Sequence, residues 1–223
     1  MKRIKERTCR CCTELFSPDY RNAKRQEYCA KPECRKASKV ASQQKWLANN
    51  PDFFKGSKTT PMAVQNLFRL QFVDERANVI FLGTVGLGKT HLATALGYTA
   101  CLAGKSVLFV TAVDAINTLA AAQAANRLKA ELKKYLAPSL LILDELGYLP
   151  IDKHGADLLF QIISQRYERG ATIITSNRAY KQWPEIFNND STLTSAFLDR
   201  LLHHAETMLL DGKSYRMKDQ IEG

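Results

Sequence analysis

The sequence lacks any apolar run that approaches the roughly 20 residues needed to cross a membrane. Its basic first residues, Met1–Arg7, also lack the apolar core of a signal peptide. Internal repeats and low-complexity runs are absent as well. We therefore expect a cytoplasmic protein with no membrane partner, in which cysteines are reduced thiols or metal ligands.

Acidic residues are scarce in the first 60 positions, which hold six of them against 15 lysines and arginines. The remaining positions hold 17 basic and 16 acidic residues, so +9 of the net charge of +10 lies in the N-terminal segment. This asymmetry is typical of nucleic-acid contact. A solvated basic surface that only aids solubility stays open as the alternative.

Cysteine is nearly absent beyond residue 34, and five of the six cysteines lie between Cys9 and Cys34. Two close pairs, Cys9 with Cys12 and Cys29 with Cys34, have the spacing of a tetrahedral Zn²⁺ site. Cys11 could replace Cys12 as a ligand, and disulfides are the alternative that a reducing compartment disfavours. A segment this small needs a metal to stay folded. We expect Phe16, Tyr20 and Tyr28 to form its miniature core, a basic helix to follow over residues 35–49, and Cys101 to be a small buried apolar residue.

A glycine-rich run that fits GxxxxGK[ST] follows the apolar residues 78–82 and precedes a helix-forming stretch. A strand that feeds such a turn into a helix N-terminus directs backbone N–H groups and a positive dipole at a phosphate. Lys89 is expected to reach the β- and γ-phosphates, and the Thr90 hydroxyl to hold Mg²⁺. The predicted nucleotide-binding residues are Gly83, Thr84, Val85, Gly86, Leu87, Gly88, Lys89, Thr90 and His91.

Strand and helix patterns alternate after residue 60, which predicts an α/β fold: a P-loop NTPase with a parallel sheet between two layers of helices. We expect residues 1–50 to form a basic zinc-knuckle-like segment, 51–59 a linker and 60–223 the nucleotide-binding domain. Strands are predicted at residues 78–82, 106–111, 140–143, 172–176 and 206–210. Helices are predicted at residues 60–75, 90–103, 114–125, 128–136, 156–169 and 194–203.

Polar residues follow two of these strands. Asp144 is expected to hold Mg²⁺ and Glu145 to orient or deprotonate the attacking water. Asn177, at the tip of the next strand, is a candidate sensor of the γ-phosphate, with a turn or helix-cap role as the alternative. Arg200 is a candidate arginine finger for a neighbouring subunit, or else a structural partner of an acid on its own helix. Arg178 and Arg216 are reserve candidates, and His203 and His204 are expected to be surface or packing residues.

From about Phe72 to Lys218 the chain resembles the IstB family, the helper ATPases of a class of bacterial insertion sequences, related to DnaC helicase loaders within the AAA+ group. The resemblance rests on residues 83–93, 141–148, 159–161, 175–178, 198–201 and 214–216. Thr84 replaces a proline usual in the family, and only Thr60–Ala77 stand where the family has a longer helical domain. The cysteine-rich segment resembles small zinc-ribbon-like proteins instead.

The resemblance implies ATP binding and hydrolysis, ATP-dependent homo-oligomerisation on duplex DNA through a shared ATP site, and delivery of a partner transposase. Two alternatives remain open. One is a helicase-loader ATPase of DNA replication, which shares the same nucleotide-binding core. The other is a zinc-dependent nucleic-acid binder with a vestigial ATPase.

Overall fold

The computed structural model describes residues 6–19, 26–35, 37–38, 41 and 59–215 of the 223-residue chain. The chain divides into two compact units, Met1–Phe53 and Phe54–Gly223. The boundary between them falls within residues 51–59, of which only Thr59 is among the described residues. The predicted division into segment, linker and nucleotide-binding domain stays a prediction.

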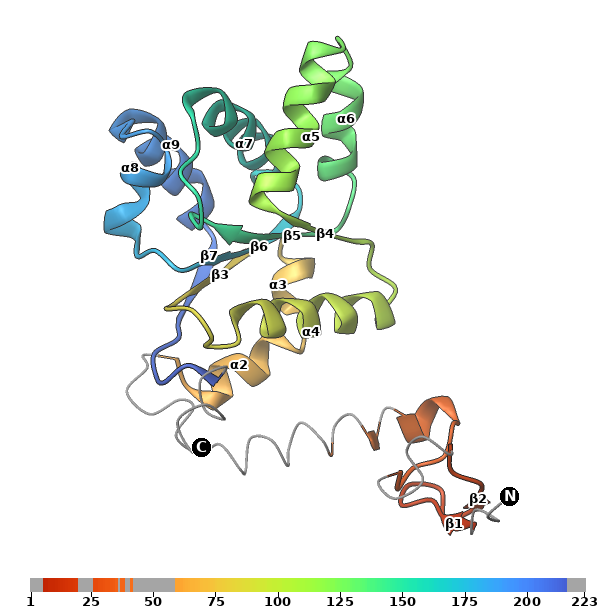
Figure 1. The fold of residues 1–223 in the computed structure, drawn as a ribbon. Coiled ribbons are helices and arrows are strands. Elements are labelled where there is room, and N and C mark those ends of the chain that lie inside the picture. The colour runs from red at the N-terminus through yellow and green to blue at the C-terminus, as the bar shows by residue number, and fades with distance from the viewer. Residues whose placement is uncertain (1–5, 20–25, 36, 39–40, 42–58, 216–223) are drawn as a thin grey trace. The chain divides into compact units, whose positions relative to one another are not determined.

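Five parallel strands form one sheet within residues 59–215, in the order β4–β5–β6–β3–β7. The central strands are almost wholly buried, whereas the edge strands β4 and β7 have exposed positions, as expected for a sheet covered on both faces. Because the strands are parallel, their carboxyl ends share one edge of the sheet (Figure 1). The bounds are Asn78–Leu82 (β3), Val107–Thr111 (β4), Leu140–Leu146 (β5), Ala171–Ser176 (β6) and Ala205–Leu209 (β7).

Helices cover both faces of this sheet, and each face has its own apolar core (Figure 1). Ile80 and Phe81 are neighbours on β3 but belong to opposite cores, as the alternation of side chains along a strand requires. This arrangement confirms the predicted α/β class. One layer holds α2 (Pro61–Leu67), α3 (Gln71–Asp74) and α4 (Lys89–Leu102); the other holds α5 (Ala112–Ala124), α6 (Leu128–Leu136), α7 (Lys153–Arg166), α8 (Trp183–Ile186) and α9 (Ser191–Leu202).

Three predictions for the helices were wrong in detail. The helix expected over residues 60–75 is interrupted, because Leu70 takes a left-handed backbone with φ 61° between α2 and α3. The helix expected to reach residue 169 ends at Arg166, followed by Glu168 with φ 57°. Cys101 is exposed on α4 rather than buried.

A short helical region was not predicted at all. The 3₁₀ turn η2 (Tyr180–Gln182) leads directly into α8, and Trp183 at their junction is fully buried. Its ring packs edge-on against Phe187 and Phe197. Tertiary burial of these aromatic side chains, rather than any local periodicity, accounts for a helix as short as α8.

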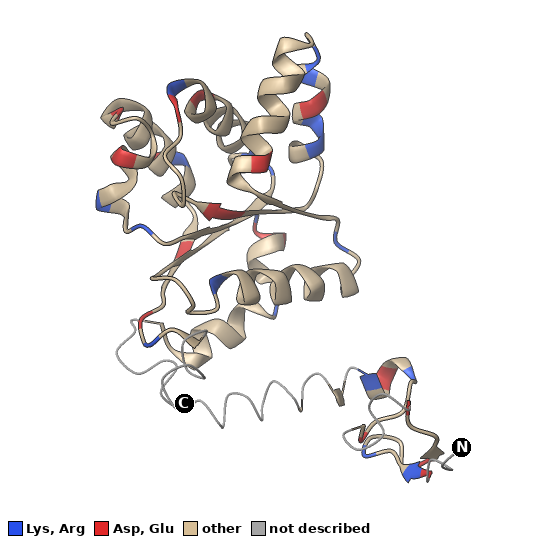
Figure 2. Ribbon diagram, viewed as in Figure 1, with Lys and Arg blue, Asp and Glu red and all other residues tan. Residues whose placement is uncertain are grey.

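The N-terminal unit contains a small antiparallel pair, β1 (Arg7–Thr8) with β2 (Leu15–Phe16). Phe16 and Tyr28 pack against a cluster of buried cysteines, as predicted, while Tyr20 and most of the predicted basic helix lie outside the described residues. Basic and acidic residues are interspersed over the described part of this unit (Figure 2). Arg10 pairs with Glu27 at 3.2 Å, and Lys31 with Glu14 at 2.6 Å. Across the described part of the chain, no helix is long and apolar enough to span a membrane.

Candidate nucleotide and metal sites

The glycine-rich run forms the turn between β3 and α4, at the carboxyl edge of the sheet (Figure 1). Gly83, Gly86 and Gly88 have φ values of 153°, 82° and 79°, a region that side chains disfavour. Gly88 caps α4, so the N–H groups of the first helical turn, which have no partner within the helix, face the loop. Within the loop, Leu87 is buried, whereas Thr84 and Val85 are exposed, as is His91 beyond it. This geometry is that of a phosphate cradle.

Lys89 and Thr90 open α4 and lie at the mouth of this loop. The ammonium group of Lys89 donates hydrogen bonds to the carbonyl oxygens of Gly83 and Thr84, at 2.8 and 2.7 Å. These contacts hold the cation over the turn that would receive a phosphate. The Thr90 hydroxyl instead points toward β5, where it donates to Asp144 Oδ1 at 3.1 Å.

Asp144 is a buried carboxylate, 3% exposed, near the carboxyl end of β5. The Thr175 hydroxyl on β6 donates to the same Oδ1 that Thr90 contacts, at 2.5 Å. A hydroxyl and a carboxylate at this separation match the oxygen ligands that Mg²⁺ prefers. The two predicted Mg²⁺ ligands are therefore brought together, although they lie on different elements far apart in sequence.

Glu145, the next residue, is exposed and has a left-handed backbone with φ 60°. The register between β5 and β6 shifts at this point, so a bulge separates Leu143 from Leu146. The Glu145 N–H donates to Thr175 Oγ1 at 2.9 Å. A bulge re-aims a side chain out of the strand, and a left-handed non-glycine residue costs about 1–3 kcal/mol. The bulge and the left-handed backbone thus leave the Glu145 side chain exposed, while the adjacent Asp144 carboxylate is buried.

Thr175 is the functional residue that sequence reasoning overlooked. It was noted only as part of the resemblance, with no role of its own. Its hydroxyl contacts both the Asp144 carboxylate and the Glu145 backbone. The available sequence signal was a threonine in an apolar strand pattern, one position before the predicted strand end at residue 176.

Asn177 follows β6, which pairs with the P-loop strand β3 on one side and with β5 on the other. Its Oδ1 atom is buried and accepts no hydrogen bond from the described residues. Buried polar atoms are nearly always paired, so an orphaned acceptor at this edge requires an explanation such as a ligand or water. Ala179 rather than Asn177 is the cap of the following 3₁₀ turn, and the sensor role of Asn177 stays a prediction.

The segment after β7 also contacts the P-loop, which was not predicted. Tyr215 N–H donates to the carbonyl oxygen of Gly86 at 3.0 Å. A Cβ atom on Gly86 would overlap Ser214 Oγ, and one on Gly83 would overlap the Leu210 carbonyl oxygen. The two glycines are therefore required by close packing as well as by their backbone angles.

Of the arginine candidates, Arg200 lies apart from this site. Arg200, near the end of α9, donates to the Ala196 carbonyl oxygen at 3.0 Å and lies 4.9 Å from the centre of the Phe160 ring. Since α9 leads into the start of β7, Arg200 is near the opposite edge of the sheet from the P-loop of its own chain. Arg178 pairs with Glu185 at 3.6 Å, and Arg216 lies outside the described residues.

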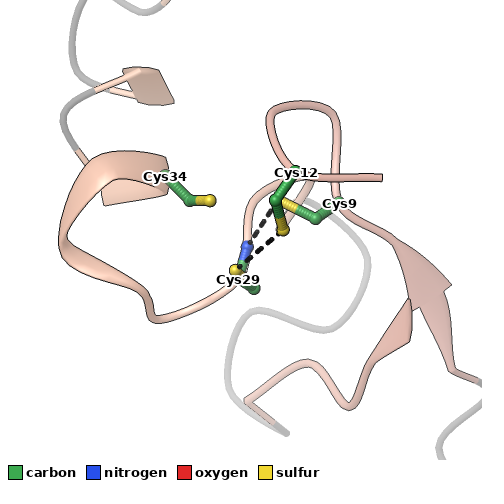
Figure 3. Close-up of side chains that lie close together, drawn as sticks. All are labelled: Cys9, Cys12, Cys29 and Cys34. Carbon is green, nitrogen blue, oxygen red and sulfur yellow. Dashed lines mark hydrogen bonds between the residues drawn. The ribbon is translucent and has the colours of Figure 1, made fainter. Parts of the chain in front are cut away.

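Four cysteines of the N-terminal unit converge: Cys9, Cys12, Cys29 and Cys34 (Figure 3). The Cys12 and Cys29 sulfur atoms are 3.7 Å apart, close to the edge of about 3.8 Å that four Zn–S bonds of about 2.3 Å produce in a tetrahedron. Cys11 is exposed and outside the cluster, so the geometry favours Cys12 as the ligand.

The surroundings of these thiols also suit a metal. Burial opposes ionisation of Cys9, yet backbone hydrogen bonds from Cys12 and Cys29 lower its pKa to about 6. Burial raises the pKa of Cys34. A buried thiol of this kind is ionised by coordination to a cation rather than by water, and the four sulfur donors fit Zn²⁺.

Comparison with known proteins shows the family of the second unit, Phe54–Gly223, which we call the nucleotide-binding unit. The family model described as IstB-like ATP binding protein matches residues 20–223, and so begins earlier than about Phe72, where the resemblance was expected to begin. The chain is 45% identical over 156 residues to the ATP-binding protein of insertion sequence IS232 from Bacillus thuringiensis subsp. berliner, covering 70% of this chain and 62% of the relative. It is 46% identical over 157 residues to that of IS21 from Pseudomonas aeruginosa, covering 70% and 59%. The matched region thus spans about three-fifths of these relatives' length.

Solved structures show the same fold at low sequence identity. The DnaC helicase loader superposes with a TM-score of 0.56 at 22% identity, covering 67% of this chain and 87% of that one. The replication initiator DnaA, bound to AMPPCP and single-stranded DNA, gives a TM-score of 0.57 at 22% identity, covering 77% and 53%. These likenesses show that the nucleotide-binding unit shares the fold of these two proteins.

Proposed function

The chain belongs to the family of IstB-like ATP-binding proteins, and on that premise we propose that it hydrolyses ATP with Mg²⁺, assembles on duplex DNA and assists a transposase. The observation that carries the proposal is the hydrogen-bonded set Thr90–Asp144–Thr175–Glu145 at the mouth of the P-loop. A site that only bound nucleotide would not need a second, exposed carboxylate held by backbone strain beside the first.

The residues around the P-loop have distinct roles in the proposed reaction. Lys89 and the N–H groups of the loop neutralise phosphate charge, and Thr90 and Asp144 hold the cation. Bound Mg²⁺ supplies charge stabilisation at the phosphates. Glu145 orients the attacking water and accepts its proton. Asn177 acts as the sensor, contacting the γ-phosphate or that water through its side-chain amide. Its buried Oδ1 atom, which has no hydrogen-bond partner among the described residues, supports this role.

Arg200 is proposed to act on the nucleotide of a neighbouring copy. Its distance from its own P-loop is consistent with a role in trans, in which the guanidinium stabilises phosphate charge across a subunit contact. Hydrolysis then requires assembly, which ties ATP turnover to the DNA-bound state.

The N-terminal unit is proposed to hold one Zn²⁺ through Cys9, Cys12, Cys29 and Cys34. A cluster this small cannot bury enough apolar surface to fold alone, so the cation supplies its stability. The positive charge of the first 60 residues supports DNA contact by this unit. A DNA affinity that falls steeply with salt and is lost in a Cys12→Ser variant supports this assignment, and affinity unchanged in that variant contradicts it.

The direct experiment is ATP turnover by the full chain with and without duplex DNA. Lys89→Ala is expected to abolish turnover, whereas Lys133→Ala, an exposed lysine on α6, serves as the matched control. Absence of turnover in both conditions, or turnover unchanged by Lys89→Ala, contradicts the proposal. Co-purification with a transposase rather than a replicative helicase distinguishes the transposition role from that of a helicase loader.

A further inference from the structure

A second candidate metal site lies in the nucleotide-binding unit, outside everything assigned above. Helix α9 ends at Leu202, so His203 and His204 lie in the turn that leads into β7. Their side chains can therefore face the same ion, which adjacent residues within a helix cannot do. The donor atoms of His203, His204 and Glu168 all lie within 4.8 Å of one another. We propose that these three side chains form a binding site for a divalent transition-metal cation such as Zn²⁺.

The distances favour a shared ion. Glu168 Oε1 is 4.0 Å from His203 Nδ1 and 4.0 Å from His204 Nε2. Tetrahedral bonds of about 2.0–2.1 Å place donor atoms about 3.3 Å apart, so each pair closes by less than about 1 Å. All three side chains are at least half exposed, which leaves them free to make this adjustment and leaves an open position for water.

The backbone holds the carboxylate toward the histidines. Glu168 has a left-handed φ of 57°, and its carbonyl oxygen accepts a hydrogen bond from Arg76 at 3.1 Å. Within the described part of the chain, the ion-pair partners of the Glu168 carboxylate are the two imidazoles alone. A divalent ion placed between these donor atoms would bind the carboxylate and both imidazoles at once.

Tyr167 adds an orienting contact. Its hydroxyl lies 2.9 Å from His203 Nδ1, and the two rings are 5.5 Å apart between centres. The histidine rings themselves are in edge-to-face contact with centres 4.2 Å apart. Without the ion, the Tyr167 hydroxyl holds the His203 ring near Glu168. When the ion binds, it replaces the hydroxyl as the partner of the Nδ1 atom. We therefore expect Tyr167→Phe to retain the site.

A cation here would join the turn after α7 to the end of α9, at the sheet edge opposite the P-loop. Arg200 lies one helical turn before His203, so the ion would fix the part of α9 that carries this arginine. The site is thus suited to stabilising that end of α9 rather than to catalysis.

Zinc titration of the full chain tests the site. Reduced protein is first saturated with one Zn²⁺ per chain to fill the cysteine cluster, and a second equivalent is followed by calorimetry at pH 7.5. Wild type is expected to bind the second ion, and Glu168→Gln or His204→Asn to weaken it at least about tenfold. His154→Asn, an exposed histidine on α7 outside the cluster, is the matched control and should leave binding unchanged.

Imidazole NMR spectra provide a second readout that does not depend on affinity. The second equivalent should shift the resonances of His203 and His204 and leave those of His154 in place. Equal binding by wild type and the Glu168→Gln variant, or equal shifts of all histidines, overturns the proposal. A Cys12→Ser variant separates the two sites, because it should lose the first ion and keep the second.

Discussion

Replacing Thr175 with valine tests whether the Asp144–Glu145 pair is organised by this one hydroxyl. Valine keeps the shape of threonine but removes a donor to the Asp144 carboxylate and an acceptor for the Glu145 N–H. A hydrogen bond to a charged group contributes about 1.5–3 kcal/mol. If that contribution is made where charge develops in the reaction, kcat falls by about 10- to 100-fold.

The assay separates binding from turnover. Because the P-loop is untouched, the dissociation constant for ATP should stay within about threefold of wild type while kcat falls. Thr175→Ser, which retains the hydroxyl, should recover most of the rate. Thr99→Val is the control for loss of a threonine hydroxyl, because the Thr99 hydroxyl donates to the Ala95 carbonyl oxygen on its own helix α4, away from Asp144 and Glu145. A kcat for Thr175→Val within about twofold of wild type refutes the reasoning.

Three further predictions concern packing and metal binding. Gly86→Ala should weaken ATP binding at least about tenfold, since its Cβ is forced onto Ser214 Oγ at a left-handed backbone position, and a second change, Ser214→Gly, should recover part of the loss in an equilibrium binding assay. Arg166→Leu should lower the free energy of unfolding by about 3 kcal/mol or more in urea titrations, because the buried guanidinium donates to four carbonyl oxygens and one hydroxyl to which leucine cannot donate; a loss under about 1 kcal/mol would contradict this. Cys12→Ser should remove zinc from the N-terminal unit by metal analysis, whereas Cys11→Ser should retain it; the reverse pattern would exchange their roles.

Local sequence patterns predicted most of the nucleotide-binding unit, because its central strands are continuous apolar runs and its P-loop follows one of them directly. Thr60 caps α2 immediately before Pro61, a local signal that depends on neighbouring residues alone. The left-handed turns at Leu70 and Glu168 were not predicted, because neither residue type favours that backbone and the surrounding packing imposes it.

Contacts between distant segments account for the rest. The role of Thr175 depends on the register of β5 against β6, and the position of Ser214 beside Gly86 depends on the path of the chain after β7. The meeting of Glu168 with His203 and His204 depends on where two helices end. None of these contacts is visible in local periodicity. The sequence also left open whether Cys11 or Cys12 is the zinc ligand, and the structure favours Cys12 because its side chain lies in the cluster.

The central claim is that Asp144 and Glu145 form a hydrolytic site on the P-loop. Single-turnover ATP hydrolysis by the full chain on duplex DNA, compared between wild type and Glu145→Gln, tests it most directly. The account predicts that Glu145→Gln binds ATP and assembles on DNA but loses at least about 100-fold in the hydrolysis rate. Hydrolysis by Glu145→Gln at the wild-type rate would contradict it.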